Sequence, residues 1–223
     1  MRFTGYPQST NGLTRLEGVI AVGVTAILTA IVLPAFMTRL GDDRGVIPVL
    51  VNAKQVHHAL AAYAVDYRGW FPKAGLTASE SYQALFPTYL SSKELFFARH
   101  SAWTPNPPLD HDPDPSTLRP GQNHFAYVPG LRVDSNPDFP LVAEGFVEGR
   151  PGVYSNGLKA KGGRMRGQVV IVVRVDGRGR AERPYRSDYR VYDSTGIFSK
   201  RDIFAPAVDW LASDQAPLNP AGE

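Results

Sequence analysis

The chain has 223 residues and a formal net charge of +3, with 43% hydrophobic and 20% charged residues. This length and composition allow one membrane helix and one globular domain of moderate size, and they leave little room for two full soluble domains. The 21 glycines and 19 prolines exceed the usual combined share of about 12% and favour long loops and turns, while the absence of cysteine excludes disulfide bonds and thiolate metal sites.

Residues 1–12, MRFTGYPQSTNG, carry one charge, Arg2, among residues that favour turns. We expect no folded structure in this segment and interpret it as a leader. A secretory signal peptide is the competing interpretation, and it requires small residues at the first and third positions before the cleavage point. Cleavage after Ala35 would place Leu33 at the third position, which does not fit.

Residues 18–36 contain no charged side chain. As a helix, at about 1.5 Å of rise per residue, they match a hydrocarbon core of roughly 30 Å, so we predict a transmembrane helix over 13–36. A single carboxylate, Glu17, stands at the start of the uncharged run. Because a carboxylate is costly in hydrocarbon unless a cation or a proton neutralises it, this acid is the main indication of function.

Glu17 is part of a longer pattern. Gly12 is followed by Leu13 and Thr14, Glu17 is the fifth residue after Gly12, and Pro34 is the twenty-second. The pattern resembles the N-terminal signature of type IV pilin-like proteins, which include the pseudopilins of type II secretion. In that family a prepilin peptidase cuts after the glycine, the new first residue, usually Phe, is N-methylated, and Thr, Glu and Pro occupy the second, fifth and twenty-second positions of the mature chain.

The resemblance implies a role for each of these residues. Gly12 and Leu13 would form the processing site, Thr14 and Glu17 would serve subunit assembly, and Pro34 would bend the helix. Cleavage would also free the α-amino group of Leu13, a cation that can neutralise Glu17 of a neighbouring subunit and so favour polymerisation. The alternative is that Glu17 merely flanks an ordinary signal anchor at the membrane interface.

The resemblance also implies partners and a location. The partners are a prepilin peptidase, other pilin-like subunits in a homo- or hetero-polymer, the assembly platform of the inner membrane, and membrane lipid. The chain would cross the inner membrane once, with its N-terminus in the cytoplasm and its globular domain in the periplasm. Arg15 departs from the pattern, since the family normally has an aliphatic residue there.

Helical periodicity resumes after a break at 41–48, GDDRGVIP. Apolar residues then recur at spacings of four and three, which predicts the buried face of a helix that ends near Gly69. These residues are Val49, Ala53, Val56, Leu60, Tyr63 and Tyr67. We expect residues 37–69 to form an amphipathic continuation of the long helix, with this face laid against a sheet.

Residues 52–72 also resemble the stretch that follows the prepilin span in one large bacterial subfamily of pseudopilin-like proteins. The match consists of a Lys-Gln pair, a Tyr, an Asp and a Gly-x-Phe-Pro ending, namely Lys54, Gln55, Tyr63, Asp66, Gly69, Phe71 and Pro72. The Phe-Pro-x-Tyr-Leu turn of that subfamily matches residues 86–90, but its Cys-Pro is absent. Arg166 stands where related chains often have a His before an Asp-Gly.

Four runs predict strands at 125–128, 141–146, 168–175 and 179–183, the last two joined by an Asp176-Gly177 turn. A short helix over 202–211 and a flexible C-terminal tail complete the globular domain, residues 70–223. The expected fold is α+β: a long N-terminal helix, membrane-spanning in its first half and amphipathic in its second, packed on a small antiparallel β-sheet with long loops.

No residue pattern predicts catalysis or a cofactor, because the sequence has no nucleophile elbow, phosphate-binding loop or HExxH helix. The adjacent His57 and His58 cannot ligate one ion in the usual i, i+4 manner. Asp110, Asp112 and Asp114 alternate like the start of a calcium loop, but the Gly and the distal Glu of such loops are missing. A solvated acidic loop is the favoured interpretation, and we expect a structural protein, not an enzyme.

The segment 159–190 holds ten basic residues and three acidic ones, a local excess of positive charge in a chain whose remainder is net negative. The favoured interpretation is a solvated hairpin whose arginines pair with neighbouring acids. The alternative is a polyanion-binding surface, with the candidates Lys159, Lys161, Arg164, Arg166, Arg178 and Arg180. Nucleic acid is disfavoured as a partner. The competing function is a non-polymerising, membrane-anchored periplasmic module that presents this basic hairpin to DNA or glycan.

Overall fold

The computed structural model describes residues 45–73, 75–106, 114, 117–192, 201–204 and 217–221. All of them belong to one compact unit, Gly45–Glu223. The predicted leader, the predicted span over 13–36 and the first eight residues of the predicted continuation lie outside the described residues. Within the described part of the chain, no helix combines the length and the apolar character that crossing a bilayer requires.

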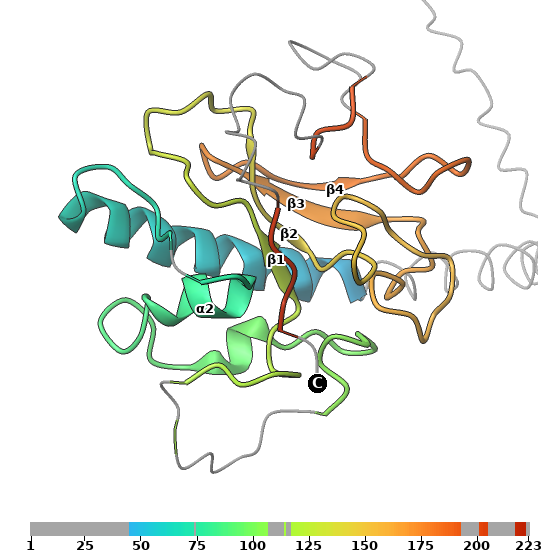
Figure 1. Ribbon diagram of the computed structural model, residues 1–223, viewed down its shortest axis with the longest axis horizontal. Helices are drawn as coiled ribbons and strands as arrows, with labels where there is room; N and C mark the ends of the chain where they lie inside the picture. Colours follow the sequence, from blue (N-terminus) through green and yellow to red (C-terminus); the bar gives the residue numbers. More distant parts are fainter. Residues whose placement is uncertain are drawn as a thin grey trace, which may run out of the picture. The chain divides into compact units, whose positions relative to one another are not determined.

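The first described element is a helix over residues 45–66, drawn in blue to teal in Figure 1. Four residues of its predicted apolar face lie in the hydrophobic core, namely Val49, Ala53, Val56 and Leu60. Tyr63 is only half-buried and Tyr67 is exposed. The buried stripe is therefore confirmed up to the last turn of the helix, where it gives way to a solvent-facing aromatic pair.

The helix ends where the sequence predicts. Gly69 has φ +85°, and its N–H donates to the carbonyl oxygen of Ala64 at 2.7 Å. Helices commonly end at a residue with a left-handed backbone conformation whose N–H donates to a carbonyl oxygen of the last turn. Glycine adopts this conformation without steric cost. Phe71 follows as a buried residue, and its N–H donates to the carbonyl oxygen of Leu131 at 3.2 Å.

The two segments that carry the subfamily resemblance meet at this end of the helix. The hydroxyl of Tyr89 donates to Asp66 Oδ2 at 2.7 Å, and this hydrogen bond raises the pKa of Tyr89 to about 12. Tyr63 stacks on Tyr67 with the ring centroids 3.9 Å apart, and Tyr89 meets Tyr63 edge to face. Side chains from 86–90 thus tie that segment to the end of the helix.

The sheet is an antiparallel four-stranded meander in the order β1-β2-β3-β4. Its strands are β1 (Phe125–Tyr127), β2 (Pro140–Glu144), β3 (Val170–Arg174) and β4 (Gly179–Glu182). All four lie inside or within one residue of the predicted runs, so these predictions are confirmed. Every residue of the first three strands is buried, whereas β4 forms a partly exposed edge.

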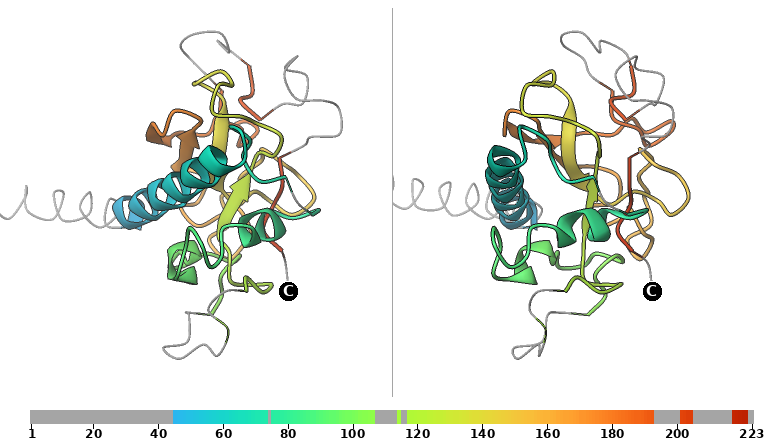
Figure 2. Two further views of the ribbon diagram at one scale, coloured as in Figure 1. Left: turned by 90° about the vertical axis from the view of Figure 1, so that its left-hand side faces the viewer. Right: turned by 60° about the vertical axis from the view of Figure 1, so that its left-hand side comes forward.

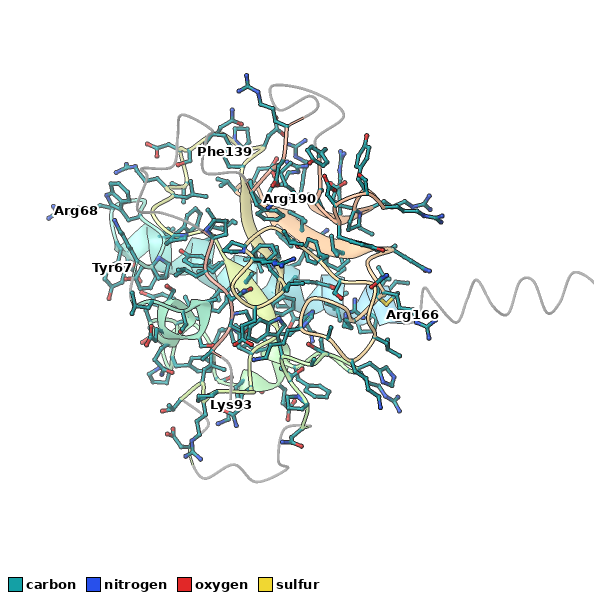
Figure 3. All side chains as sticks on the ribbon, turned by 45° about the vertical axis from the view of Figure 1, so that its right-hand side comes forward. Tyr67, Arg68, Lys93, Phe139, Arg166 and Arg190 are labelled. Atoms are coloured by element: carbon teal, nitrogen blue, oxygen red, sulfur yellow. The ribbon has the colours of Figure 1, made fainter. Side chains whose placement is uncertain are left out.

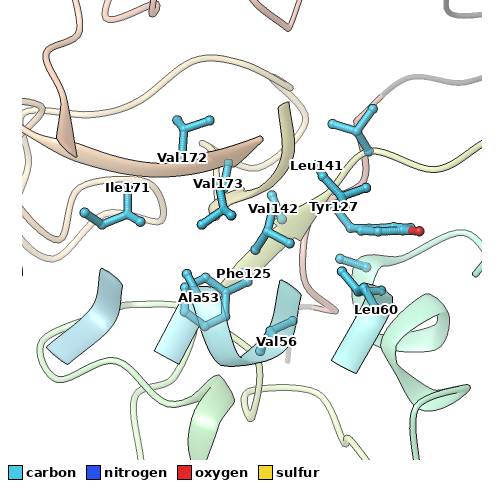
Figure 4. Packing of buried hydrophobic residues seen from close by; sticks show 14 of the residues in the cluster. Ala53, Val56, Leu60, Phe125, Tyr127, Leu141, Val142, Ile171, Val172 and Val173 are labelled. Carbon is cyan, nitrogen blue, oxygen red and sulfur yellow. The ribbon is translucent and has the colours of Figure 1, made fainter. Parts of the chain in front are cut away.

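The core lies between the helix and the sheet, and the helix runs along one side of the sheet in both views of Figure 2. In Figure 4, Ala53, Val56 and Leu60 point from the helix toward Phe125, Val142 and Val173 of the strands. All six side chains are fully buried. The coarse prediction of an α+β unit with a helix packed on a small antiparallel sheet is therefore confirmed for the described residues.

The turn between β3 and β4 is docked on the helix. Gly177 has φ +81°, and its N–H donates to the carbonyl oxygen of Arg174 at 2.9 Å. On the helix, His57 Nε2 donates to the carbonyl oxygen of Val175 at 2.9 Å. Burial lowers the pKa of His57, and the hydrogen bond to Val175 and the charge of Asp176 oppose this only in part.

Two short helices, α2 (Ala78–Gln83) and η1 (Lys93–Phe96), lie beside the end of the sheet that carries β1. Thr77 and Glu80 form a capping box that starts α2: Glu80 N–H donates to Thr77 Oγ1 at 3.3 Å and Thr77 N–H donates to Glu80 Oε2 at 3.0 Å. Neither short helix was among the elements predicted from the sequence.

The end of the chain differs from the prediction. Residues 217–221 were expected in a flexible tail, but Leu218 exchanges two backbone hydrogen bonds with Tyr127 of β1, at 3.0 and 2.8 Å. This segment therefore covers the outer edge of the sheet, as the red trace beside β1 in Figure 1 shows. At the start of the predicted 202–211 helix, Asp202 forms a bridge with Tyr192 and residues 203–204 form a turn, while 205–211 lie outside the described residues.

Candidate functional site

Most residues of the predicted pilin-like and calcium sites lie outside the described residues. These are Gly12, Leu13, Thr14, Glu17, Pro34, Asp110 and Asp112. Asp114 is described, and its backbone carbonyl oxygen accepts a hydrogen bond from Lys93 Nζ at 2.7 Å. Within the described ranges, no three His, Cys, Asp or Glu side chains gather closely enough to hold a metal ion.

The basic segment 159–190 is described in full, and it consists of two groups of side chains. Five of its ten basic residues form ion pairs: Lys161 with Glu148, Arg164 with Glu144, Arg174 with Glu182, Arg178 with Asp138 and Asp176, and Arg190 with Asp202. The expectation that arginines here pair with neighbouring acids therefore holds for half of the segment.

Arg164 is buried, although the sequence placed it among the candidates for polyanion binding. Its Nη2 and Nε lie 2.5 and 3.2 Å from Glu144 Oε1, and its Nη1 donates to the carbonyl oxygen of Gly45 at 2.9 Å. Burial acts to raise the pKa of Glu144, but His124 and Arg164 together hold it below its ordinary value. All three guanidinium nitrogens bind groups inside the unit and the side chain is buried, so Arg164 is not part of an exposed basic surface.

The Glu144 carboxylate also faces a buried histidine. His124 Nε2 lies 3.8 Å from Glu144 Oε1, and His124 Nδ1 lies 2.8 Å from Ser101 Oγ. A serine, a histidine and a glutamate in a row are also the components of a hydrolase triad, but all three side chains are buried and Ser101 Oγ accepts the N–H of Trp103 at 3.1 Å. A substrate has no access to this network, which instead fixes the loop that carries Arg164.

Two further predicted candidates are held by specific contacts. Lys161 Nζ lies 3.1 Å from both carboxylate oxygens of Glu148 and 4.6 Å from the ring centroid of Trp103. Arg178 pairs with Asp176 and, at 2.6 Å, with Asp138 Oδ1. Both cations face a carboxylate at close range, which reduces the charge that they offer to a ligand.

The other five basic residues are exposed and form no ion pair with an acidic side chain in the described part of the chain. They are Lys159, Arg166, Arg180, Arg183 and Arg186. Only three of them, Lys159, Arg166 and Arg180, belong to the set that the sequence proposed. Figure 3 shows Arg166 at the end of the unit where residue 45 lies, and Tyr67 and Arg68 at the opposite end.

The loop of Arg166 and the turn over 185–190 lie side by side. A Cβ atom on Gly167 would stand 2.7 Å from the ring of Tyr189. Tyr185 N–H donates to the carbonyl oxygen of Arg190 and Tyr189 N–H to that of Tyr185, at 2.9 and 2.8 Å, so the turn is closed on itself. Arg186 lies in this turn, which adjoins the loop of Arg166.

No protein-family model, no curated protein and no solved structure matches the chain. Its function is therefore inferred from its own residues. Sequence reasoning did not find the Arg164–Glu144 pair, although one signal pointed to it. Glu144 lies inside the run 141–146 that was predicted to be a strand, among apolar residues, and a carboxylate that is buried there requires a cationic or hydrogen-bonding partner. That signal indicates that a partner exists but does not identify Arg164.

Proposed function

We propose that this protein is a prepilin-like structural subunit of a pilus or pseudopilus, in a type II secretion-like system, that polymerises through its N-terminal helix. The observation that carries the proposal is the register of four positions in the sequence: Gly12, then Thr14, Glu17 and Pro34 as the second, fifth and twenty-second residues that follow. Glu17 stands directly before residues 18–36, which carry no charged side chain and as a helix are long enough to cross a bilayer.

The assembly step follows from electrostatics. In hydrocarbon an isolated carboxylate is penalised by several kcal/mol. Cleavage after Gly12 would place a new amine on Leu13, and Glu17 of an incoming subunit would meet that amine on a neighbour. Within one helix the amine of Leu13 is close in sequence to Glu17, but the pair is better satisfied between neighbours, so the neutralisation of Glu17 would favour the polymer over the separate subunit.

The described unit supports the proposal through its helix. The 45–66 helix packs one face on the sheet, but Ile47 and Val51 on another face are 62% and 46% exposed. These two apolar residues are four positions apart, so they lie on one face of the helix. The first turns of this helix thus expose two apolar side chains that a neighbouring helix would cover.

Two measurements test the proposal. The intact mass of protein extracted from membranes should lack residues 1–12 and carry one added methyl group at Leu13. Replacement of Glu17 by Ala should abolish fibre assembly while membrane insertion continues, and Arg15→Ala, which removes the neighbouring charge but keeps the acid, should assemble. Fibres of Glu17→Ala in parental amounts, or residues 1–12 still attached in fibres, would contradict the proposal.

A second candidate function is supported by the five exposed basic residues without an ion-pair partner in the described ranges. In that alternative the protein is a non-polymerising, membrane-anchored periplasmic module that binds DNA or glycan through this surface. An intact Met1 in the extracted protein favours it over the first proposal. DNA binding through phosphate contacts depends steeply on salt, so a gel-shift series against salt with no retained DNA at low salt excludes the DNA form of this alternative.

A further inference from the structure

Arg166, one of the exposed basic residues, lies at the end of the unit where residue 45 lies. Arg164 Nη1 donates to the carbonyl oxygen of Gly45, and a Cβ atom on Gly45 would stand 3.4 Å from Arg164 Nη1 and 3.8 Å from Met165 Sδ. Arg166 is two residues further along the same loop and points to solvent. The buried pair of Arg164 thus fixes a loop with an exposed arginine directly beside residue 45 (Figure 3).

The β3–β4 hairpin brings more positive charge to the same end. Its turn lies over His57, and Gly179 lies against Leu50 and Lys54, one to two turns closer to residue 45. Strand β4 then runs on to Glu182, which pairs with Val170 at the start of β3. Arg183 and Arg186 follow β4, and the contact of Tyr189 with Gly167 joins their turn to the loop of Arg166.

Exposed apolar side chains lie next to the charges. Leu158 is 43% exposed beside Lys159, and Tyr185 is 56% exposed beside Arg186. Basic residues interspersed with tyrosine and leucine are typical of protein surfaces that lie in the head-group region of a membrane. A groove for a nucleic-acid or glycan chain would not require the exposed leucine.

The charge of this surface is balanced only in part. Asp188, the acid in the 185–190 turn, accepts hydrogen bonds from two neutral donors, the Tyr192 hydroxyl and the Arg190 N–H, at 2.6 and 3.1 Å. It keeps its negative charge and so offsets one of the basic residues of this surface. Residues 37–44, which connect the predicted span to the unit, contain two arginines and two aspartates and add no net charge. Residue 45 is the ninth residue after the predicted span, and the loop of Arg166 lies beside this point of entry into the unit.

We propose that Lys159, Arg166, Arg183 and Arg186, with Leu158 and Tyr185, dock the unit on the anionic phospholipid head groups of the membrane that holds its anchor. The docking rests on the proposed function for the anchor, and it adds a second contact between the subunit and lipid. It holds the globular unit against the membrane surface before assembly. Each basic side chain near an anionic leaflet contributes about a fivefold preference for the docked state.

The experiment uses the full-length protein in nanodiscs. Because the chain has no cysteine, a polarity-sensitive dye can be placed at Ser187→Cys, an exposed position in the 185–190 turn. The control probe is Val133→Cys, an exposed residue that lies against Gly69 at the other end of the helix. We compare discs of phosphatidylcholine alone with discs that also contain phosphatidylglycerol, at low and high salt.

We expect the Ser187→Cys probe to report a less polar environment in phosphatidylglycerol discs at low salt, while the Val133→Cys probe does not change. High salt should reverse the effect, since it screens the head-group charge. The triple variant Arg166→Gln, Arg183→Gln and Arg186→Gln should lower the ratio of docked to undocked protein about 100-fold, at about fivefold per residue. Arg68→Gln, an exposed arginine at the opposite end of the helix, should have no effect.

Three outcomes overturn the docking. The first is a probe signal that does not depend on phosphatidylglycerol. The second is a signal that follows the number of protein copies per disc, which would report an acidic neighbouring subunit. The third is oligonucleotide binding that depends on the three arginines, without any effect of lipid. Failure of the anchor is measured separately: without a working anchor, a high-salt wash should release the protein from phosphatidylcholine discs. If the protein docked on phosphatidylglycerol discs but were not retained on phosphatidylcholine discs, the docking would be supported and the proposed membrane anchor would be contradicted.

Discussion

Arg164 and Glu144 form a buried ion pair in which two nitrogens of the guanidinium approach the same carboxylate oxygen, at 2.5 and 3.2 Å. The third nitrogen reaches the carbonyl oxygen of Gly45, 119 residues earlier in the chain. One side chain therefore connects the loop over 157–168, the end of β2 and the helix that begins the described unit. The position of the exposed basic surface beside residue 45 depends on this connection.

Loss of Arg164 should therefore destabilise the unit strongly. We expect Arg164→Met to lower the free energy of unfolding by about 3–5 kcal/mol, because it leaves the Glu144 carboxylate buried without its cation. The matched control is Arg166→Met, two residues away and exposed, for which we expect a change within about 0.5 kcal/mol. Urea denaturation of the full-length protein, followed by tryptophan fluorescence, measures both.

A double replacement separates the cost of a broken pair from the value of the pair. If the buried Glu144 charge is the cause, Arg164→Met combined with Glu144→Leu should be more stable than Arg164→Met alone, since the double variant leaves no unpaired carboxylate. Equal stability of the single and double variants would show that the lost contact to Gly45 dominates.

Two buried histidines should make the unit less stable in mild acid. Burial lowers the pKa of both His57 and His124, so the unfolded chain, with its ordinary histidine value of 6.5, binds more protons than the folded one. Stability should therefore be complete above about pH 7, fall as the pH drops through 6.5, and level off below the folded-state values. For each histidine, the free energy of unfolding should change by at most about 1.4 kcal/mol per pH unit.

The substitution His57→Gln should reduce this slope, because the amide can still donate to the carbonyl oxygen of Val175 but does not titrate. His58→Gln is the control, since His58 is exposed on the same helix. Urea midpoints measured between pH 5 and pH 7.5 compare the two variants. A slope unchanged in His57→Gln and in His124→Gln would contradict the assignment to these two groups.

The β3–β4 turn offers a test of its contact with the helix. Gly177→Ala places a side chain at φ +81° and brings its Cβ to 3.0 Å from His57 Cε1. Gly149→Ala has the same kind of backbone strain, at φ +68°, but nothing within 4 Å of the new atom. We expect the control to lose about 1–2 kcal/mol of unfolding free energy from strain alone, and Gly177→Ala to lose about 1 kcal/mol more. Equal losses would mean that the turn moves off the helix at little cost.

The parts of this fold that the sequence predicts are those with a repeating local signal. The spacing of Val49, Ala53, Val56 and Leu60 predicts the buried face of the helix. The β-branched run over 168–175 predicts β3, and Asp176-Gly177 predicts the turn that follows it. Each of these signals arises from residues that are neighbours in the chain, because helices and turns are closed by local hydrogen bonds and strands alternate their side chains with a short period.

The parts that it does not predict depend on contacts between distant residues. Nothing in the sequence GGRMRG distinguishes Arg164, which is buried, from Arg166, which is exposed. Their difference is set by Glu144 and Gly45, which are 20 and 119 residues away. A local signal for α2 was present, since Thr77 and Glu80 match the spacing of a capping box, but the helix has only six residues and no apolar periodicity of its own.

The C-terminal segment offers a further prediction, because the side chain of Asn219 binds the backbone that follows β2. Asn219 Oδ1 accepts the N–H of Phe146 at 2.9 Å, and Asn219 Nδ2 donates to the carbonyl oxygen of Val147 at 3.2 Å. We expect Asn219→Ala to lower the free energy of unfolding by about 1–3 kcal/mol, since two backbone groups lose their partners. Hydrogen exchange should also quicken at the amides of Phe146 and Tyr127, which face this segment. The exposed Asn156 provides the control, and Asn156→Ala should change neither quantity. If the two variants behaved alike, the Asn219 side chain would not be what holds residues 217–221 in place.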